Sequence, residues 1–254
     1  MDKLRFIGII PARYGSSRFP GKPLANLGGL TVIERVWRQA SSVLDSVLVA
    51  TDDARIADAV ACFGGKAVMT SPNHKSGTDR CREAYLKNGG GEDVIINIQG
   101  DEPFVQPEQI KSLMECFADP TTDIATLVKP FNSARPFSDL ENPNSPKVVL
   151  DSEMHACYFS RSVIPYVRNV AKEDWPKSTQ YYTHLGMYAY RAKVLEEVTK
   201  LPQSPLELAE SLEQLRWLEN GYKIKVGFSD VETIGIDTPE DLKRAEDFLS
   251  KSNC

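Results

Sequence analysis

Three cationic side chains and several small residues follow the first apolar run of the chain. After residues 6–10 the sequence continues Pro-Ala-Arg-Tyr-Gly-Ser-Ser-Arg-Phe-Pro-Gly-Lys-Pro, which contains Arg13, Arg18 and Lys22. Small residues let backbone N–H groups approach a polyphosphate, and Arg and Lys neutralise its charge. The segment therefore predicts a phosphate-binding loop in preference to a solvated loop with incidental charge.

Two familiar nucleotide motifs do not fit this loop. The P-loop pattern needs four residues between its glycines, followed by Lys and then Ser or Thr. Here five residues separate Gly15 from Gly21, and Lys22 is followed by Pro23. The dinucleotide pattern G-x-G-x-x-G is absent from the sequence. The loop thus disfavours kinase-type and dehydrogenase-type sites.

Two carboxylates also follow expected strands. Asp101 comes after the apolar run 94–98, and Asp237 stands just before Thr238-Pro239, a strong helix start that does not need Asp237 as its cap. Ligands bind at the carboxyl ends of parallel strands, and carboxylate oxygens suit Mg²⁺. Asp101 and Asp237 are therefore candidate ligands of one metal ion. From the residues alone, a turn or a surface acid explains each of them equally well.

The elements around these segments alternate as in a mostly parallel sheet covered by helices. Thr31, with Glu34 three residues later, predicts a capping box at the start of the first helix. Strands are expected over residues 6–10, 47–50, 66–69 and 94–98, and helices over 31–44, 54–63 and 79–86.

The pattern changes after about residue 129. A Pro-containing stretch over 131–146 predicts a long irregular connection, and short apolar runs predict an antiparallel meander over 148–150, 156–159 and 187–190. A helix over 205–218, a strand over 223–227 and a helix from Pro239 then complete the main domain. We expect one α/β domain over 1–254, with a smaller inserted lobe at about 130–200.

The composition excludes several classes of protein. The chain has 254 residues, with 30 Lys+Arg against 35 Asp+Glu, and this acidic balance disfavours a general nucleic-acid binder. The first apolar run is far shorter than the roughly 20 residues of a membrane span. Five widely spaced cysteines without a C-x-x-C pair predict reduced thiols in a cytoplasmic protein, with Cys254 the exposed one.

Eight segments together resemble a known family. They are Ile10-Pro-Ala-Arg-Tyr14, Phe19-Pro-Gly-Lys-Pro-Leu24, Ser76-Gly-Thr-Asp-Arg80, Asn97-Ile-Gln-Gly-Asp-Glu-Pro103, Lys147-Val-Val-Leu-Asp151, His184-Leu-Gly-Met-Tyr188, Leu212-Glu-Gln-Leu-Arg216 and Gly235-Ile-Asp-Thr-Pro-Glu-Asp241. In this order they resemble the 3-deoxy-manno-octulosonate (Kdo) cytidylyltransferases, the CMP-Kdo synthetases. The match runs from the first strand to the last helix.

The resemblance implies a fold and an activity. The fold would be the nucleotide-diphospho-sugar transferase type, an α/β nucleotide-binding domain with an inserted lobe that helps to form a homodimer. The reaction would transfer CMP from CTP to Kdo, with release of pyrophosphate and with Mg²⁺ required. The product would serve lipopolysaccharide biosynthesis.

The resemblance also implies residue roles. Arg13 and Lys22 would be the catalytic cations on the triphosphate, assisted by Arg18, and Asp101 and Asp237 would hold Mg²⁺. Cytosine would be read near Ala12, Arg80 and Gln99. The sugar-pocket residues would be Gln99, His184, Tyr188, Glu213 and Gln214.

From the residues alone, three of these assignments have a plainer explanation. Arg80 also fits an ordinary helix-face cation, His184 a core histidine and Glu213 a solvated helix face. His74 and His155 are expected to be structural, because neither has partners that suggest a metal site.

Two alternatives stay open. A CMP-sugar synthetase for acylneuraminate typically has a lysine-asparagine pair after the arginine loop, where this chain has Gly21-Lys22-Pro23-Leu24. A non-catalytic nucleotide-binding or assembly protein would keep the fold but is expected to lose a metal carboxylate, whereas Asp101 and Asp237 are both present.

Overall fold

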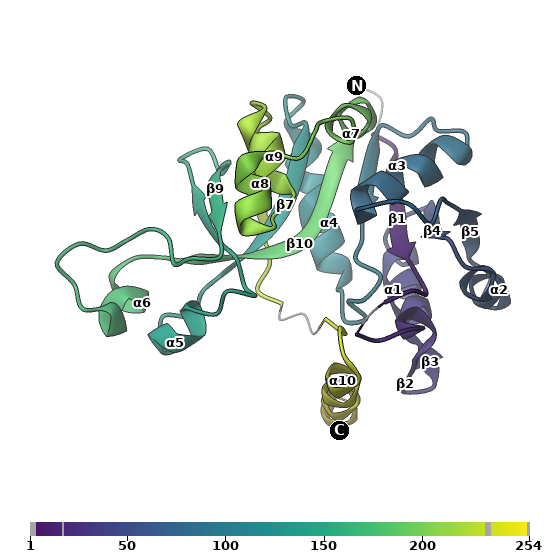
Figure 1. Cartoon of the computed structure of the whole chain (residues 1–254), viewed down its shortest axis with the longest axis horizontal. Coiled ribbons are helices and arrows are strands. Elements are labelled where there is room, and N and C mark those ends of the chain that lie inside the picture. Colours follow the sequence, from purple (N-terminus) through teal and green to yellow (C-terminus); the bar gives the residue numbers. More distant parts are fainter. Residues whose placement is uncertain (1–3, 17, 232–234, 253–254) are drawn as a thin grey trace. The chain divides into compact units, whose positions relative to one another are not determined.

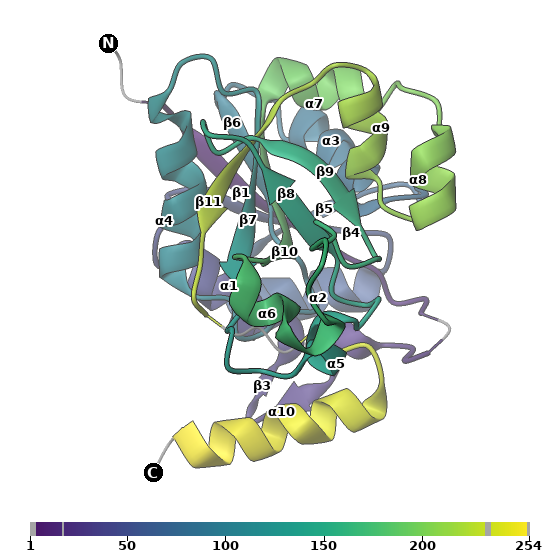
Figure 2. The ribbon, with the colours of Figure 1, turned by 90° about the vertical axis from the view of Figure 1, so that its left-hand side faces the viewer.

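The computed structural model describes residues 4–16, 18–231 and 235–252 (Figures 1 and 2). The chain divides into two compact units, one formed by residues 1–110 with 232–254 and the other by residues 111–231. The range expected for an inserted lobe, 130–200, falls within the second unit, but that unit is wider. It also contains the helix and strand elements over 205–227, which the sequence analysis expects in the main domain. Cys254 lies outside the described residues, and the other four cysteines are free thiols. Cys62 and Cys157 are exposed, so the expectation that exposure distinguishes Cys254 was wrong.

The first unit contains a parallel sheet with the strand order β6-β1-β4-β5. Figure 1 labels β1, β4 and β5 of this sheet. Its strands are β1 (Phe6–Ala12), β4 (Val47–Thr51), β5 (Lys66–Met69) and β6 (Val94–Asn97). The four expected strands are therefore confirmed. Ile7, Ile9 and Ile10 of β1 have no exposed surface, as expected for a parallel strand with neighbours on both edges and helices over the sheet.

Helices follow these strands as the sequence predicts. They are α1 (Val32–Ser41), α2 (Ala54–Cys62) and α3 (Gly77–Lys87), with α10 (Pro239–Ser252) at the end of the chain. The Thr31 hydroxyl accepts the Glu34 N–H at 3.2 Å, which confirms the predicted helix start. Only this half of the predicted capping box forms, because Glu34 Oε1 accepts from Arg38 instead of the Thr31 N–H. However, α1 ends at Ser41, three residues earlier than expected. The Ser42 hydroxyl donates to the Gln39 carbonyl at 2.7 Å, a local bond that competes with further helix.

Short elements connect the larger ones in this unit. The turn η1 (Lys22–Leu24) is followed by the hairpin strands β2 (Asn26–Leu27) and β3 (Leu30–Thr31). Leu27, Val32, Phe104, Ile236 and Ala245 form a buried cluster against which Leu242 and Leu249 of α10 pack. This cluster fixes the C-terminal segment beside the loops that carry the site.

The second unit contains the predicted antiparallel meander (Figure 2). β8 (Lys147–Leu150) pairs with β9 (Ala156–Ser160) and with β10 (Tyr182–Arg191), and β10 pairs with β7 (Ile124–Pro130). β11 (Ile224–Phe228) runs parallel to β7. Strand β10 starts five residues before the predicted 187–190, and its register with β7 shifts between Leu185 and Tyr188.

The helices of the second unit differ more from the prediction. The helix expected over 205–218 is two helices, α8 (Pro205–Glu210) and α9 (Gln214–Glu219). The break comes at Ser211, whose φ of 51° is left-handed and ends α8. The connection over 131–146 contains the short helix α5 (Phe137–Leu140). The sequence analysis did not predict β7, α4 (Pro107–Glu115), α6 (Trp175–Ser178) or α7 (Ala192–Val198).

Among the described residues, no helix combines the length and the apolar character that crossing a membrane requires.

Candidate functional site

A cavity of about 460 Å³ lies in the first unit, where β1 and β6 end. Its volume is in the range of small-molecule sites. Eight predicted site residues line it together: Ala12, Arg13, Arg18, Lys22, Arg80, Gln99, Asp101 and Asp237. The remaining wall is formed by Pro11, Gly15, Ser16, Pro23, His74, Ser76, Gly77 and Gly100.

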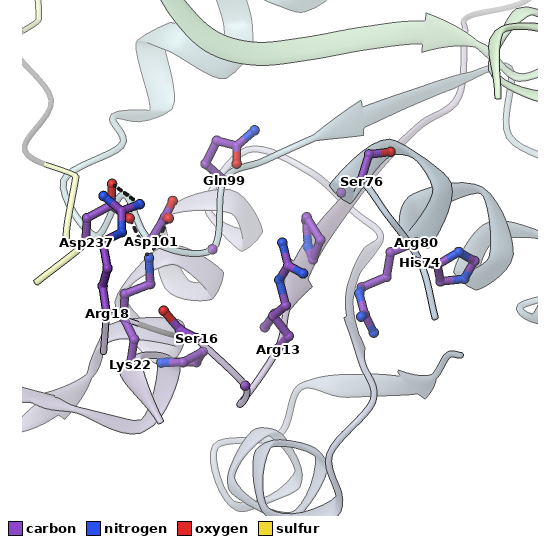
Figure 3. A pocket seen from close by; sticks show the side chains of 16 residues that line it. Arg13, Ser16, Arg18, Lys22, His74, Ser76, Arg80, Gln99, Asp101 and Asp237 are labelled. Carbon is purple, nitrogen blue, oxygen red and sulfur yellow. Dashed lines mark hydrogen bonds and ion pairs between the residues drawn. The ribbon is translucent and has the colours of Figure 1, made fainter. Parts of the chain in front are cut away.

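Lys22 joins the two predicted metal carboxylates at one end of this cavity (Figure 3). Its Nζ donates to Asp101 Oδ2 at 2.7 Å and to Asp237 Oδ1 at 3.1 Å. Arg18 Nη2 lies 3.2 Å from Asp237 Oδ2. The Lys22 side chain is 12% exposed, so its charge is largely removed from water while the two carboxylates balance it. Residues from the start and the end of the chain thus form one charged cluster.

Backbone contacts position the two carboxylates independently of their charge. The Ile236 N–H donates to the Asp101 carbonyl at 2.9 Å. Asp241 Oδ2 accepts the N–H groups of Asp237 and Thr238, and Thr238 Oγ1 accepts the Asp241 N–H at 3.2 Å. Asp241 and Thr238 therefore cap α10, and the Asp237 side chain stays available to the cavity, as the sequence predicts.

Gly100 shows why a glycine precedes Asp101. A Cβ at Gly100 would lie 2.6 Å from the carbonyl oxygen of Pro11, closer than real Cβ contacts come. The chain after β6 can pass the end of β1 only without a side chain at this position. The close passage places Asp101 beside the cationic loop.

Arg13 differs from the other two cations of the loop. It is exposed, lines the cavity, and makes no hydrogen bond or ion pair with another described residue. In the view of Figure 3 it lies between the Lys22 cluster and the Arg80 end of the cavity. A guanidinium without a partner can give its N–H donors to an anionic ligand.

Arg80 is bound within the protein. Its Nη1 donates to Thr70 Oγ1 at 2.6 Å and its Nη2 to Asp52 Oδ2 at 2.9 Å, and only 3% of the residue is exposed. These contacts fasten α3 to the segments that follow β4 and β5. The role of Arg80 with cytosine stays a prediction.

His74 was expected to be structural, yet it lines the cavity beside Arg80 (Figure 3). Its Nε2 contacts Glu83 Oε2, which also accepts the Ser71 N–H at 2.8 Å. Burial alone would raise the pKa of Glu83, but contacts with Lys87, Ser71 and His74 lower it to about 2. The resulting carboxylate holds the His74 ring at the wall of the cavity.

The acidic pair Asp101-Glu102 carries less negative charge than its sequence suggests. Burial raises the pKa of Glu102 to about 7, and the charge of neighbouring Asp101 acts in the same direction. Glu102 is therefore partly protonated near neutral pH.

The arrangement of Asp101 and Asp237 fits a divalent cation. Both carboxylates already converge on one cationic group, the Lys22 ammonium, and both line the same cavity. Their oxygens are hard ligands of the kind that Mg²⁺ takes, together with phosphate oxygens and water.

The other four predicted sugar-binding residues belong to the second unit. His184 and Tyr188 lie on β10 with ring centroids 5.3 Å apart. Thr126 Oγ1 is 3.0 Å from His184 Nε2. The His184 ring also packs against Phe159, and burial lowers the pKa of His184 to about 3. His184 is therefore neutral at physiological pH.

Glu213 and Gln214 lie where α9 begins. Arg216 Nη2 donates to Glu213 Oε1 at 2.7 Å. Gln214 is 4% exposed, and its buried Nε2 has no hydrogen-bond partner among the described residues. Burial and the Glu213 charge raise the pKa of Tyr188 well above its ordinary value, so its hydroxyl stays protonated. His184, Tyr188 and Gln214 therefore offer neutral hydrogen-bonding groups suited to hydroxyl-rich ligands.

Comparison with known proteins shows the family to which the chain belongs. The family model described as cytidylyltransferase matches residues 7–224. A 3-deoxy-manno-octulosonate cytidylyltransferase of Bacteroides thetaiotaomicron is 68% identical over 246 residues, covering 97% of this chain and 98% of the relative. The chain belongs to the 3-deoxy-manno-octulosonate cytidylyltransferase family. The resemblance found in the sequence is thereby confirmed.

More distant members of the family and solved structures agree. The enzyme of the same name from Thermodesulfovibrio yellowstonii is 47% identical over 252 residues, which is 96% of this chain and 98% of the relative. A CMP:2-keto-3-deoxy-manno-octonic acid synthetase solved with CTP has a TM-score of 0.89 and 41% identity, covering 98% of this chain and 99% of its own. A putative glucose-1-phosphate thymidylyltransferase from Bacillus anthracis has a TM-score of 0.64 at 17% identity, over 96% of this chain and 94% of its own, and shows the shared fold alone.

The sequence analysis did not assign a site role to three lining residues of this cytidylyltransferase, His74, Ser76 and Gly77. Ser76 caps α3 by accepting the Asp79 N–H at 3.1 Å. A Ser-Gly pair at a helix start after a strand is the signal that could have found this wall, because exposed N–H groups gather there.

Proposed function

We propose that the chain transfers CMP from CTP to the anomeric hydroxyl of Kdo and releases pyrophosphate. One observation carries the proposal: a single cavity gathers Arg13, Arg18 and Lys22 together with Asp101 and Asp237, in a chain that belongs to a family of Kdo cytidylyltransferases. Cations stabilise a triphosphate, and paired carboxylates stabilise a metal that such a ligand brings.

The reaction makes one bond and breaks one. The sugar oxygen forms a bond to the α-phosphorus of CTP, the bond from that phosphorus to the bridging oxygen breaks, and pyrophosphate leaves with the electron pair. The hydroxyl proton passes to solvent. Because little covalent chemistry falls to the protein, catalysis depends on alignment and on stabilisation of charge.

The cationic loop supplies the charge stabilisation. Arg13, which has no partner among the described residues, is available to the triphosphate. Lys22 is held in the cavity by two carboxylates, so its position is set before the nucleotide arrives. Preorganised cations of this kind stabilise charge as it develops on a leaving group.

We further propose that Asp101 and Asp237 hold Mg²⁺ when the nucleotide binds. The ion would polarise the phosphate and lower the pKa of the sugar hydroxyl. In that state the two carboxylates have a second cation beside Lys22, and no side chain is required as a general base.

Kdo recognition is proposed for His184, Tyr188, Glu213 and Gln214, with Gln99 at the nucleotide cavity. Two observations support this proposal: Gln214 Nε2 has no hydrogen-bond partner in the described part of the chain, and His184 is neutral. Each supplies hydrogen-bonding capacity that a sugar with many hydroxyl groups can use.

The deciding experiment compares two sugars. The purified chain, with CTP and Mg²⁺, is given Kdo or an acylneuraminate. Pyrophosphate release is measured, and the product is identified by ³¹P NMR. We expect turnover with Kdo and the signal of a CMP-sugar diester. Turnover with acylneuraminate alone would instead assign the neighbouring synthetase activity, and no release with either sugar would favour a non-catalytic nucleotide binder.

A homodimer and a cytoplasmic location are also proposed. Within the second unit Phe131, Leu140, Trp175 and Tyr181 form a small apolar cluster. Tyr166, 73% exposed, stacks edge-on against Trp175 and offers apolar surface to a second copy. Light scattering coupled to gel filtration tests the mass, and a monomer at micromolar concentration would contradict the dimer. The four free thiols are consistent with a reducing compartment.

A further inference from the structure

Tyr14, a residue of the cationic loop, contacts Arg55 outside the cavity. The Arg55 guanidinium carbon lies 3.4 Å from the centroid of the Tyr14 ring. Neither residue is among the described residues that line the cavity. Tyr14 follows Arg13 directly, and Arg55 lies in the first turn of α2.

Tyr14 touches the far end of the same loop. The Gly21 N–H donates to the Tyr14 carbonyl at 2.9 Å, and a Cβ at Gly21 would come within 3.0 Å of the Tyr14 ring carbon Cζ. Gly21 has a φ of 74°, the left-handed conformation that favours glycine. The ring thus packs on the residue that precedes Lys22 and closes the loop between Arg13 and Lys22.

Arg55 is itself fixed. Its Nε donates to Asp53 Oδ1 at 2.9 Å and its Nη2 to Asp53 Oδ2 at 2.7 Å, which makes a bidentate ion pair. Asp53 Oδ1 also accepts the Arg55 N–H and so caps α2. Strand β4 pairs with β1 up to Thr51, which lies opposite Ala12. The contact between Arg55 and Tyr14, called the clamp below, is therefore anchored close to the residue where the loop begins.

Arg55 differs from the loop cations because it does not line the cavity. Its guanidinium is engaged by the Asp53 carboxylate and by one face of the Tyr14 ring. The contact with Tyr14 is that of a planar cation stacked on an aromatic ring, an attraction that depends on the shape of the guanidinium as well as on its charge.

We infer that Arg55 is a positioning residue that holds the phosphate-binding loop, through Tyr14, in its nucleotide-binding conformation before CTP arrives. The inference rests on the proposed function for its substrate, but the clamp itself is a property of the free protein. Loss of the clamp lowers the fraction of molecules with a competent loop, which raises the apparent KM for CTP. The value of kcat changes little, because bound triphosphate holds the loop in place.

The first test uses Arg55→Met and Arg55→Lys, with Arg38→Met as the matched control. Arg38 is similarly exposed (57% against 60%) and paired with a carboxylate, Glu34, but does not touch the loop. We expect both Arg55 variants to raise KM for CTP roughly three- to tenfold with kcat within about twofold, and Arg38→Met to leave both constants unchanged. A wild-type KM in Arg55→Met, which has lost the cation over the Tyr14 ring, would overturn the inference.

The second test asks whether Arg55 acts through Tyr14. In a Tyr14→Leu background, Arg55→Met is expected to cause no further rise in KM, because the contact is already gone. Equal effects of Arg55→Met in both backgrounds would overturn the proposed route.

The third measurement does not depend on activity. Amide hydrogen exchange at Gly21 and Lys22, whose N–H groups bond to Tyr14 and Phe19, is expected to be several-fold faster in nucleotide-free Arg55→Met than in wild type. Unchanged exchange would overturn the clamp. If wild type fails to turn over CTP with Kdo while exchange still responds, the proposed function fails and the clamp stands.

Discussion

Ile236 donates its backbone N–H to the carbonyl oxygen of Asp101 at 2.9 Å. This bond joins the segment before α10 to the loop after β6 and places Asp237 next to Asp101. Two carboxylates so close repel each other, and the Lys22 ammonium between them offsets the repulsion. The backbone bond thus sets the distance between the two carboxylates, and the positive charge of Lys22 stabilises them at that distance. A divalent ion can then join a pair of carboxylates that the fold has already brought together.

Asp101→Asn is expected to lower kcat by about 10²–10³, a loss of about 3–4 kcal/mol of transition-state stabilisation. The change keeps the size of the side chain but removes the charge that would hold Mg²⁺. The measurement is steady-state turnover across a Mg²⁺ titration. Asp139→Asn is the control, because Asp139 is equally exposed and ion-paired to Arg135 but lies in the second unit. Near wild-type turnover of Asp101→Asn at saturating Mg²⁺ would refute the metal role.

Lys22→Ala is expected to reduce kcat/KM for CTP by about 10²–10³ if its charge meets the developing pyrophosphate. The structure adds a second loss, since Asp101 and Asp237 lose the cation that they share. Lys193→Ala removes an exposed lysine of the second unit and serves as the control. An unchanged kcat/KM in Lys22→Ala would remove this residue from the reacting site.

The sequence analysis predicted correctly that the cationic loop and Asp101 follow buried strands, because the apolar, β-branched runs 6–10 and 94–98 precede them. Ligands bind at such strand ends. The sequence analysis could not predict that Lys22 lies between two aspartates, because Asp237 is 215 positions from Lys22. The position of Asp237 depends on the packing of Ile236 and α10 in the buried cluster. His74 was interpreted as structural because its position at the cavity wall depends on Glu83, nine residues later on α3. Strand β7 was missed because Thr126 and Lys129 interrupt its apolar pattern.

Ser211 is the position where prediction from periodicity failed for a conformational reason. The apolar pattern continues from α8 into α9, but Ser211 takes a left-handed conformation that usually falls to glycine. Its side chain is exposed, so little packing depends on it. Ser211→Gly is therefore expected to stabilise the chain by about 0.5–1 kcal/mol, measured by chemical denaturation. Ser211→Val should destabilise it, and the reverse order would contradict the strain at this site.

His184 gives the stability of the chain a pH dependence whose direction can be worked out. Burial lowers its folded pKa to about 3, against about 6.5 in an unfolded chain. The unfolded state therefore binds more protons between these values, so the contribution is complete above pH 6.5 and is lost as the pH falls toward 3. The slope from this residue is at most about 1.4 kcal/mol per pH unit. In His184→Gln, which keeps a hydrogen-bonding group near Thr126, the free energy of unfolding should fall less steeply between pH 6.5 and 4.5 than in wild type. His155→Gln, at a partly buried histidine of the same unit, controls for the loss of an imidazole. Equal slopes in wild type and His184→Gln would show that His184 does not carry this dependence.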